Sequence, residues 1–414
     1  MHEPLEPSID EPRRRGLPTL MAIWTATQVV LALLTLLHGR FSYGGDITAW
    51  GQTEGALAYR YRGVENRYYD ALDRNDARAY LWIAAFGYAE VDGRHSNAAF
   101  FPGYAWAVRG AHAALRALVP KAWIPEQGKG ARLLWYHAGH LVSCLSFLAA
   151  LCLIYSWTRG RFGPQVAWRT GLLIIAGPTA FVYSCLMSES FFLALSFGAL
   201  VAAEKKHWAF AALLAAGAAA TKAFGLSLVL PLAWIYLRQA GFQWRRLGYQ
   251  WLWLVLPPLV LLGLLLHFAE FSGDPLYYFE QQRIYFGHAN FPDFWGAVEV
   301  FDLRGKSGEM FWRDLLQVVM TSAAVVGCLT FARLADGRAD RIAHLIFPAI
   351  ALGATIFAGT VISMPRYVLI IVPAYVGWAL LLRGRWVSRV VLAASWSLQA
   401  VLWLSWIHNA RIVI

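Results

Sequence analysis

Charged residues are scarce in this chain of 414 residues: Asp, Glu, Lys and Arg together make up 15% of it. Hydrophobic residues make up 58%, and the mean hydropathy is +0.45. A water-soluble globule of this composition would have to expose a largely apolar surface, so that class is excluded. The apolar runs, roughly 15 to 25 residues each, suit helices that cross about 30 Å of hydrocarbon, whereas barrel strands would be shorter and alternating. The sequence therefore predicts an all-α polytopic membrane protein.

Cysteine is also rare, and histidine and cysteine show no spacing typical of a metal site. The four cysteines lie in or at the edge of apolar runs, so we expect small core residues without a disulfide. A requirement for a divalent metal is left open. The cysteines are Cys144, Cys152, Cys185 and Cys328.

The charge balance is strongly basic, with 36 Lys and Arg residues against 25 Asp and Glu residues and a formal net charge of +11. The basic residues lie in short loops between apolar runs. That placement indicates membrane topology and not nucleic-acid binding.

The apolar runs predict about eleven transmembrane helices in one membrane domain, residues 17–414, after a polar tail at 1–16. The first run is too long for a secretory signal and lacks a small-residue cleavage site, so we expect it to be retained as a span. The short runs 207–221 and 223–238 could form one broken pair. The expected spans are 17–38, 131–157, 166–184, 187–204, 207–221, 223–238, 251–270, 314–333, 342–362, 367–382 and 388–407.

The distribution of Lys and Arg predicts the orientation, because these residues accumulate in cytoplasmic loops. With Arg13, Arg14 and Arg15 in the cytoplasm, alternating spans place a basic residue in every short loop on that side. The long segments 39–130 and 271–313 then lie outside. We expect a multi-pass protein of the plasma (inner) membrane with a cytoplasmic N-terminus.

This alternation requires that the apolar stretch 98–118 does not cross the membrane. Arg109, His112 and Arg116 interrupt it, and the aromatic residues at its start suit the headgroup level. Residues 77–90 form a second amphipathic segment. The first extracytoplasmic loop, 39–130, is therefore predicted to carry interfacial helices.

Polar and ionisable side chains gather at the extracytoplasmic ends of the predicted spans. Such groups are costly near apolar spans unless they are paired or functional, so their gathering at one face predicts a site. The residues are Asp76, Glu189, Lys222, Asp274, Gln281, Arg283 and Arg366.

Structural alternatives exist for these residues. Asp76 could cap the helix that follows it, and position alone favours capping. Glu189 could likewise cap a span, and Lys222 could extend its ammonium to the headgroups. The combination of one carboxylate and several cations favours a functional role over these structural ones. A transferase that uses a lipid-phosphate donor needs one carboxylate base and cations for the departing phosphate.

Two stretches carry a family resemblance. DARAYLWIAAFGY (76–88) and AFFPGY (99–104) resemble the W-D-x-x-W-Y-x-x-I-A-x-x-G-Y and A-F-F-P-x-Y stretch of the PIG-V family. That family comprises the GPI-anchor mannosyltransferases and their prokaryotic relatives, which have the GT-C membrane fold. Further similar segments follow in the family's order at 177–195, 208–232, 272–287 and 364–375.

The resemblance implies a hexosyltransferase that takes a sugar from a polyprenyl-phosphate donor at the extracytoplasmic face. Transfer to an acceptor hydroxyl would be an inverting single displacement, with Asp76 as base and Glu189 as a second catalytic candidate. Lys222, Arg283 and Arg366 would bind the donor phosphate. The expected substrate contacts are Tyr80, Tyr88, Phe101, Tyr104, Asp274 and Gln281.

The resemblance leaves several points open. Asn75 and Ala79 stand where the family has tryptophan, which removes aromatic surface for sugar stacking, so mannose is favoured without being fixed. The acceptor could be a lipid, a glycan or a protein, and no cofactor beyond the lipid-linked donor is implied. The alternatives are a transporter or flippase of lipid-linked sugars and a non-catalytic partner of another transferase.

Overall fold

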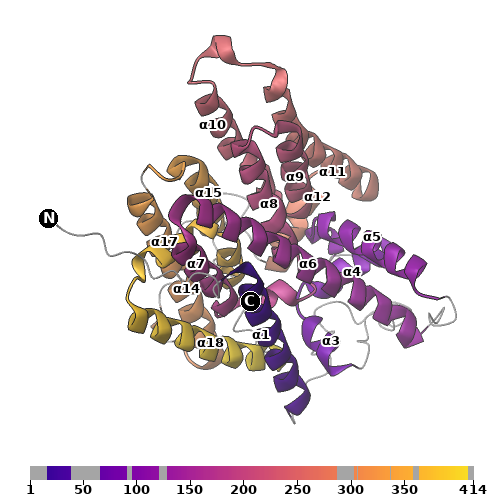
Figure 1. Ribbon diagram of the computed structural model, residues 1–414. Helices are drawn as coiled ribbons and strands as arrows, with labels where there is room; N and C mark the ends of the chain where they lie inside the picture. The colour runs from indigo at the N-terminus through magenta and orange to yellow at the C-terminus, as the bar shows by residue number, and fades with distance from the viewer. Residues whose placement is uncertain are drawn as a thin grey trace.

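A computed structural model of the protein describes residues 16–38, 66–90, 96–120, 128–286, 303–304, 306–335, 337–357 and 363–408. Within these ranges the chain is helical (Figure 1), and the β contact they contain is an isolated bridge between Glu90 and Ser96. The predicted all-α class is confirmed. The predicted tail lies outside the described residues up to position 15, and the first helix begins at Leu17.

Each of the eleven predicted spans contains helical residues, and positions 358–362 of the span 342–362 lie outside the described residues. Five helical segments among the described residues are long and apolar enough to cross a membrane: 17–37, 131–162, 249–272, 308–334 and 385–407. A sixth candidate is the pair 364–370 and 372–381, which is bent by 78°. The protein is a multi-pass integral membrane protein.

The long helices are α1 (Leu17–Leu37), α6 (Gly128–Phe162), α11 (Leu256–Ser272), α14 (Gly308–Leu334) and α18 (Arg385–Ile407). Shorter helices complete the bundle: α7 (Pro164–Ala176), α8 (Glu189–Glu204), α9 (Trp208–Thr221), α10 (Val229–Gln239), α15 (Arg341–Phe357), α16 (Met364–Tyr367) and α17 (Val372–Leu381). Tighter 3₁₀ turns connect some of them: η4 (Ala180–Ser184), η5 (Ala223–Leu228), η6 (Trp244–Arg246), η7 (Tyr249–Val255) and η8 (Val368–Ile370).

Two breaks interrupt the helices of the bundle. The sequence left open whether 207–221 and 223–238 form one broken pair, and it predicted 367–382 as one continuous span. Lys222 is extended between α9 and η5, so the run 208–239 is two helices and not one. Ile371 interrupts the last but one span before Pro373, whose missing N–H ends the hydrogen-bond ladder. Lys222 at the first break and Arg366, five residues before the second, lie 3.3 Å and 3.8 Å from Glu189 and so at the same end of the bundle.

Close helix contacts fix these breaks in place. A β carbon on Gly377 would overlap the carbonyl oxygen of Gly327, so α14 and α17 pack backbone against backbone. A β carbon on Gly225 would overlap Ala218, so η5 folds tightly onto α9. The segments that follow Arg366 and Lys222 are therefore rigidly positioned.

The first long loop contributes α3 (Arg67–Leu72), α4 (Ala77–Phe86), η2 (Asn97–Ala99) and α5 (Gly103–Leu118). Arg109 of α5 donates to the carbonyl oxygens of Ala84 (2.6 Å) and Ile83 (3.1 Å) at the end of α4. The aromatic residues at the start of α5 differ from expectation: Phe100, Phe101 and Tyr104 are buried, and Trp106 is exposed. Phe100 and Phe101 pack against Phe286 and Tyr278 of α12, and Tyr104 packs against Tyr80 and Phe191. The depth of α4 and α5 in the membrane stays a prediction.

The second long loop reaches back to the first through α12 (Tyr277–Phe286). The backbone N–H of Ser96 donates to Gln281 Oε1 (2.7 Å), and the Gln282 amide donates to the carbonyl oxygen of Ala99. These bonds tie α12 to η2 and close one side of the site.

Candidate active site

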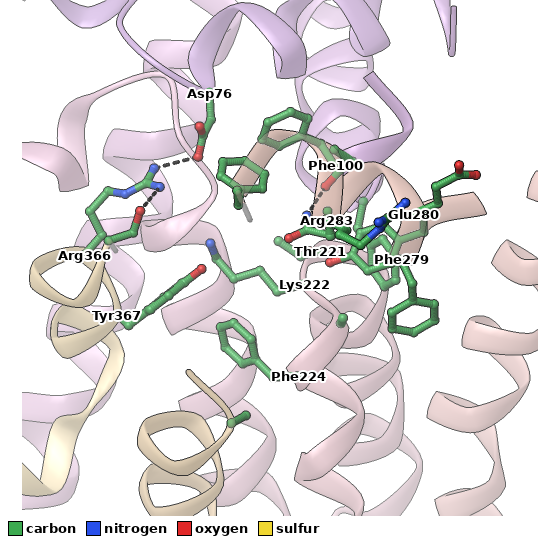
Figure 2. Close-up of a pocket in the computed structure, with 18 of the residues that line it drawn as sticks. Asp76, Phe100, Thr221, Lys222, Phe224, Phe279, Glu280, Arg283, Arg366 and Tyr367 are labelled. Carbon is green, nitrogen blue, oxygen red and sulfur yellow. Dashed lines mark hydrogen bonds and ion pairs between the residues drawn. The ribbon is translucent and has the colours of Figure 1, made fainter. Parts of the chain in front are cut away.

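A cavity of about 1040 Å³ lies where the first loop, α12, the break at Lys222 and the start of the bent pair at α16 meet (Figure 2). Several predicted site residues line it. They are Asp76, Tyr80, Phe101, Lys222, Asp274, Arg283 and Arg366.

Asp76 occupies the position before α4 without capping it. Its backbone is already helical, and its side chain makes no capping hydrogen bond. Asn75 before it has a φ of 55°, a left-handed conformation that Asn tolerates better than most residues. Asp76 Oδ2 instead accepts from Arg366 Nη1 at 2.6 Å. The other carboxylate oxygen has no hydrogen-bond partner among the described residues and is available to a ligand.

Arg366 is held by the turn that starts the bent pair. Its Nη2 donates to Ser363 Oγ at 2.9 Å, and Ser363 has a left-handed φ of 71°. Thr179 Oγ1 donates to the carbonyl oxygen of Pro365 at 2.8 Å, which fixes the turn against the segment before η4. Arg366 is buried, so its guanidinium is presented to Asp76 in one defined orientation.

Glu189 lies behind the cavity wall at the first turn of α8, with 2% of the residue exposed. Its Oε1 is 3.3 Å from Lys222 Nζ and 3.8 Å from Arg366 Nη1. The order Lys222, Glu189, Arg366, Asp76 therefore alternates in charge. Buried charges are tolerated when each has an opposite neighbour.

Lys222 lies at the break after α9 and points into the cavity (Figure 2). Its Nζ is 5.7 Å from the ring centroid of Tyr367 and 6.0 Å from that of Phe224, within reach of cation–π attraction. It pairs with Glu189 inside the protein, whereas the structural alternative would have its ammonium extend to the headgroups.

Tyr80 adds a neutral polar group to the wall beside Asp76. Its hydroxyl and Ser188 Oγ are 2.9 Å apart. Burial raises the pKa of Tyr80 well above its usual value, and the nearby carboxylates of Asp76 and Glu189 raise it further. The phenol is therefore protonated at neutral pH and can serve only as a hydroxyl donor or acceptor.

The opposite wall comes from the segment between α11 and α12 and from α12 itself. Asp274 Oδ1 accepts from the Leu276 N–H at 2.8 Å and so shapes the turn before α12. Arg283 and Glu280 project from α12 at the far side of the cavity from Arg366 (Figure 2). The lining thus carries three cations and three carboxylates.

Three predicted substrate contacts do not line the cavity. The Tyr88 hydroxyl donates to the carbonyl oxygen of Phe100 (2.9 Å), and the Tyr104 hydroxyl donates to that of Gly139 (3.0 Å). Gln281 accepts from Ser96, as described above. Each of the three holds a neighbouring backbone group, and a substrate role for them stays a prediction without support from the geometry.

Aromatic residues of the wall escaped the sequence analysis. They surround the charged groups and come from the same short segments, directly beside residues that were predicted. A search for aromatic neighbours of Lys222 and Arg366 would have found Phe224 and Tyr367. The additional aromatic lining residues are Phe100, Phe224, Tyr278, Phe279, Phe286 and Tyr367.

The described part of the chain contains no cluster of three or more His, Cys, Asp or Glu side chains suited to a metal ion. All four cysteines are free thiols. The question of a metal requirement stays open.

Comparison with known proteins gives structural likeness without sequence matches. No protein-family model matches the chain, and no curated protein matches it in sequence. The fold is similar to the ArnT of Cupriavidus metallidurans bound to undecaprenyl phosphate, at 13% identity and a TM-score of 0.48. That similarity covers 96% of this chain and 77% of the ArnT chain.

The fold is also similar to the oligosaccharyltransferase of Archaeoglobus fulgidus in two structures. The complex with zinc and sulfate has 14% identity, a TM-score of 0.49, and coverage of 93% of this chain and 53% of that chain. The form tethered to an acceptor peptide has 14% identity, a TM-score of 0.46, and coverage of 97% and 55%. At TM-scores below 0.5, these likenesses carry no argument for a shared activity.

Proposed function

We propose that the protein is a membrane glycosyltransferase that moves a sugar from a polyprenyl-phosphate donor to an acceptor hydroxyl. One observation carries the proposal: Asp76, ion-paired with Arg366, faces a cavity that also holds Lys222 and Arg283. A carboxylate base and cations for a phosphate are the groups that this transfer needs. The ordered PIG-V-like motifs described above support the same reaction.

Asp76 is the proposed general base. Arg366 holds Oδ2, and the oxygen without a partner accepts the proton of the acceptor hydroxyl. The hydroxyl oxygen forms a bond to the anomeric carbon while the bond from that carbon to the phosphate oxygen breaks. The bonding electron pair leaves with the phosphate. The displacement inverts the anomeric configuration and requires no covalent intermediate.

Lys222 is the proposed principal ligand of the donor phosphate. Its ammonium has Glu189 as one partner and aromatic faces nearby, so N–H groups stay available to oxygens in the cavity. Arg366 and Arg283 contribute positive charge from two other sides. Glu189 does not line the cavity, and we assign it a positioning role through Lys222 and Arg366 in place of a direct one.

The aromatic and small apolar residues of the lining suit the rest of the donor. Phe224, Ala351 and Ala354 lie on the wall contributed by η5 and α15 and offer an apolar surface to an isoprenoid chain. The family resemblance favours a hexose, with mannose first. The charge distribution favours the extracytoplasmic face of the plasma membrane as the location.

Purified protein in liposomes tests this function. Radiolabelled polyprenyl-phosphate sugars and a lipid extract are supplied, and labelled product is separated from donor. We expect label transfer and release of polyprenyl phosphate, with no transfer from nucleotide sugars. Transbilayer movement of the donor without transfer would instead show a flippase, and activity only with a second transferase would show a partner protein.

A further inference from the structure

A second cavity, of about 670 Å³, lies at the other end of α8 from the candidate active site. Helix α8 begins at Glu189 behind the first cavity and ends at Glu204, which lines the second. Sixteen helical residues span about 24 Å, so the two cavities are separate sites. The topology predicted from the sequence places the second one at the cytoplasmic face.

Arginines from three parts of the bundle converge on this cavity. Arg161 comes from α6, Arg238 from α10, Arg338 from the turn that leads into α15, and Arg341 from the first position of α15. Two carboxylates, Glu204 and Asp340, complete the charged lining. Cations therefore outnumber carboxylates two to one in the lining.

The carboxylate of Glu204 is already occupied by protein donors. Oε2 accepts from Arg161 and from Trp157 Nε1 (2.9 Å), and Oε1 contacts His344 Nε2 (2.8 Å). All of these partners are side chains of the bundle, so Glu204 serves to join helix ends.

The carboxylate of Asp340 is likewise engaged. It pairs with Arg238 Nη1 (2.6 Å) and accepts from Trp234 Nε1 (3.2 Å) and from the Ala343 N–H (3.2 Å).

Arg338 differs from these groups, because its guanidinium has no hydrogen-bond or ion-pair partner in the described part of the chain. It is also exposed, and it carries positive charge that the lining does not neutralise.

Two exposed apolar side chains lie beside the arginines of the cavity. Phe242 is 54% exposed and its ring centroid lies 5.4 Å from that of Trp234, while Ile342 is 50% exposed. Aromatic residues beside arginines are typical of the level where headgroups meet hydrocarbon. A ligand with both a phosphate and acyl chains fits this combination better than a free anion does.

We propose that this cavity binds the phosphate of an anionic phospholipid, with Arg338 as the principal contact. Basic pockets between helix ends on the cytoplasmic side are suited to such headgroups, and that leaflet is rich in anionic lipid. The bound lipid joins the ends of α10 and α15 to the bilayer. This inference is independent of the proposed transfer reaction.

The test measures lipid binding to the purified full-length protein in detergent, by native mass spectrometry and by the melting temperature. Phosphatidylglycerol is compared with phosphatidylcholine and with inorganic phosphate. We expect saturable binding and a raised melting temperature with phosphatidylglycerol alone. Arg338→Glu should weaken that binding about tenfold, the effect of losing one good charge-assisted contact.

The matched control is Arg389→Glu. Arg389 is an exposed arginine of α18 that lies outside the cavity, beside Trp386. It should leave phosphatidylglycerol binding unchanged. Equal losses in both variants would overturn the proposal, because they would show a general surface-charge effect. Equal binding of phosphatidylcholine, or an Arg338-dependent response to inorganic phosphate at similar concentration, would overturn it too.

Discussion

Arg366 Nη1 lies 2.6 Å from Asp76 Oδ2, although the two residues are 290 positions apart in the chain. Each of the two residues comes shortly after a non-glycine residue with a left-handed backbone. Asn75 directly precedes Asp76, and Ser363 precedes Arg366 by three positions. Two tight turns from opposite ends of the sequence thus meet at one ion pair. The orientation of the proposed base depends on both.

The pair of Lys222 and Glu189 leads to a stability prediction. Lys222→Met leaves Glu189 buried with only the more distant Arg366, and breaking a buried pair in this way costs about 3 kcal/mol. The melting temperature should therefore fall, while Lys222→Arg should largely preserve it. Thermal unfolding in detergent measures both.

A double variant separates the pair from its two members. Glu189→Gln together with Lys222→Met removes both charges, so it should be more stable than Lys222→Met alone. Strictly additive losses would contradict an interaction between the two side chains.

Much of this site could be predicted from the sequence. Lys222 and Arg366 are conspicuous because ionisable residues at the ends of apolar runs are costly, and the charge of the loops placed them at one end of the bundle. Asp76 was ambiguous, since its position also suited a helix cap. Only the structure shows that its side chain makes no capping hydrogen bond and accepts from Arg366 instead.

The rest depended on contacts that no linear pattern contains. Tyr104 and Gln281 satisfy backbone groups that other segments bring close, so their polarity gave no indication that they lie outside the cavity. The burial of Phe100 and Phe101 depends on α12 docking over them, an arrangement between two loops about 180 residues apart. The apolar runs predicted the helices of the bundle but neither the short helices α3 and α12 nor the 78° bend between η8 and α17.

The predicted topology can be checked by labelling single cysteines. In a variant whose four native cysteines are replaced, Ser307→Cys should react with a membrane-impermeant thiol reagent added outside intact cells, and Lys205→Cys should not. Both positions are exposed, so accessibility does not limit the reaction. The reverse labelling pattern would place the candidate active site on the cytoplasmic side and exclude the proposed orientation.

His112 predicts a pH dependence of stability. Its ring stacks on Trp135 with centroids 3.6 Å apart. Burial lowers the pKa of His112, and Arg116 lowers it further. The unfolded chain therefore binds the proton more readily than the folded one, so this contribution to stability is complete above the ordinary pKa of about 6.5 and is lost as the pH falls below it.

Melting temperatures between pH 5 and pH 8 measure this effect, with His112→Phe as the comparison. The phenyl ring keeps the stacking surface and has no titratable group. We expect the stability advantage of wild type over His112→Phe to shrink toward pH 5. A difference that does not change with pH would show that His112 does not titrate on unfolding in this range.

The rate of sugar transfer by Asp76→Asn is the most direct test of the proposed mechanism. A positioned general base contributes roughly a hundredfold to ten-thousandfold, so we predict at least a hundredfold loss of kcat in a variant that stays folded. Glu280→Gln is the control, because it removes a carboxylate from the same cavity on the α12 side and should change kcat only a few fold. Transfer at the wild-type rate by folded Asp76→Asn would contradict the account.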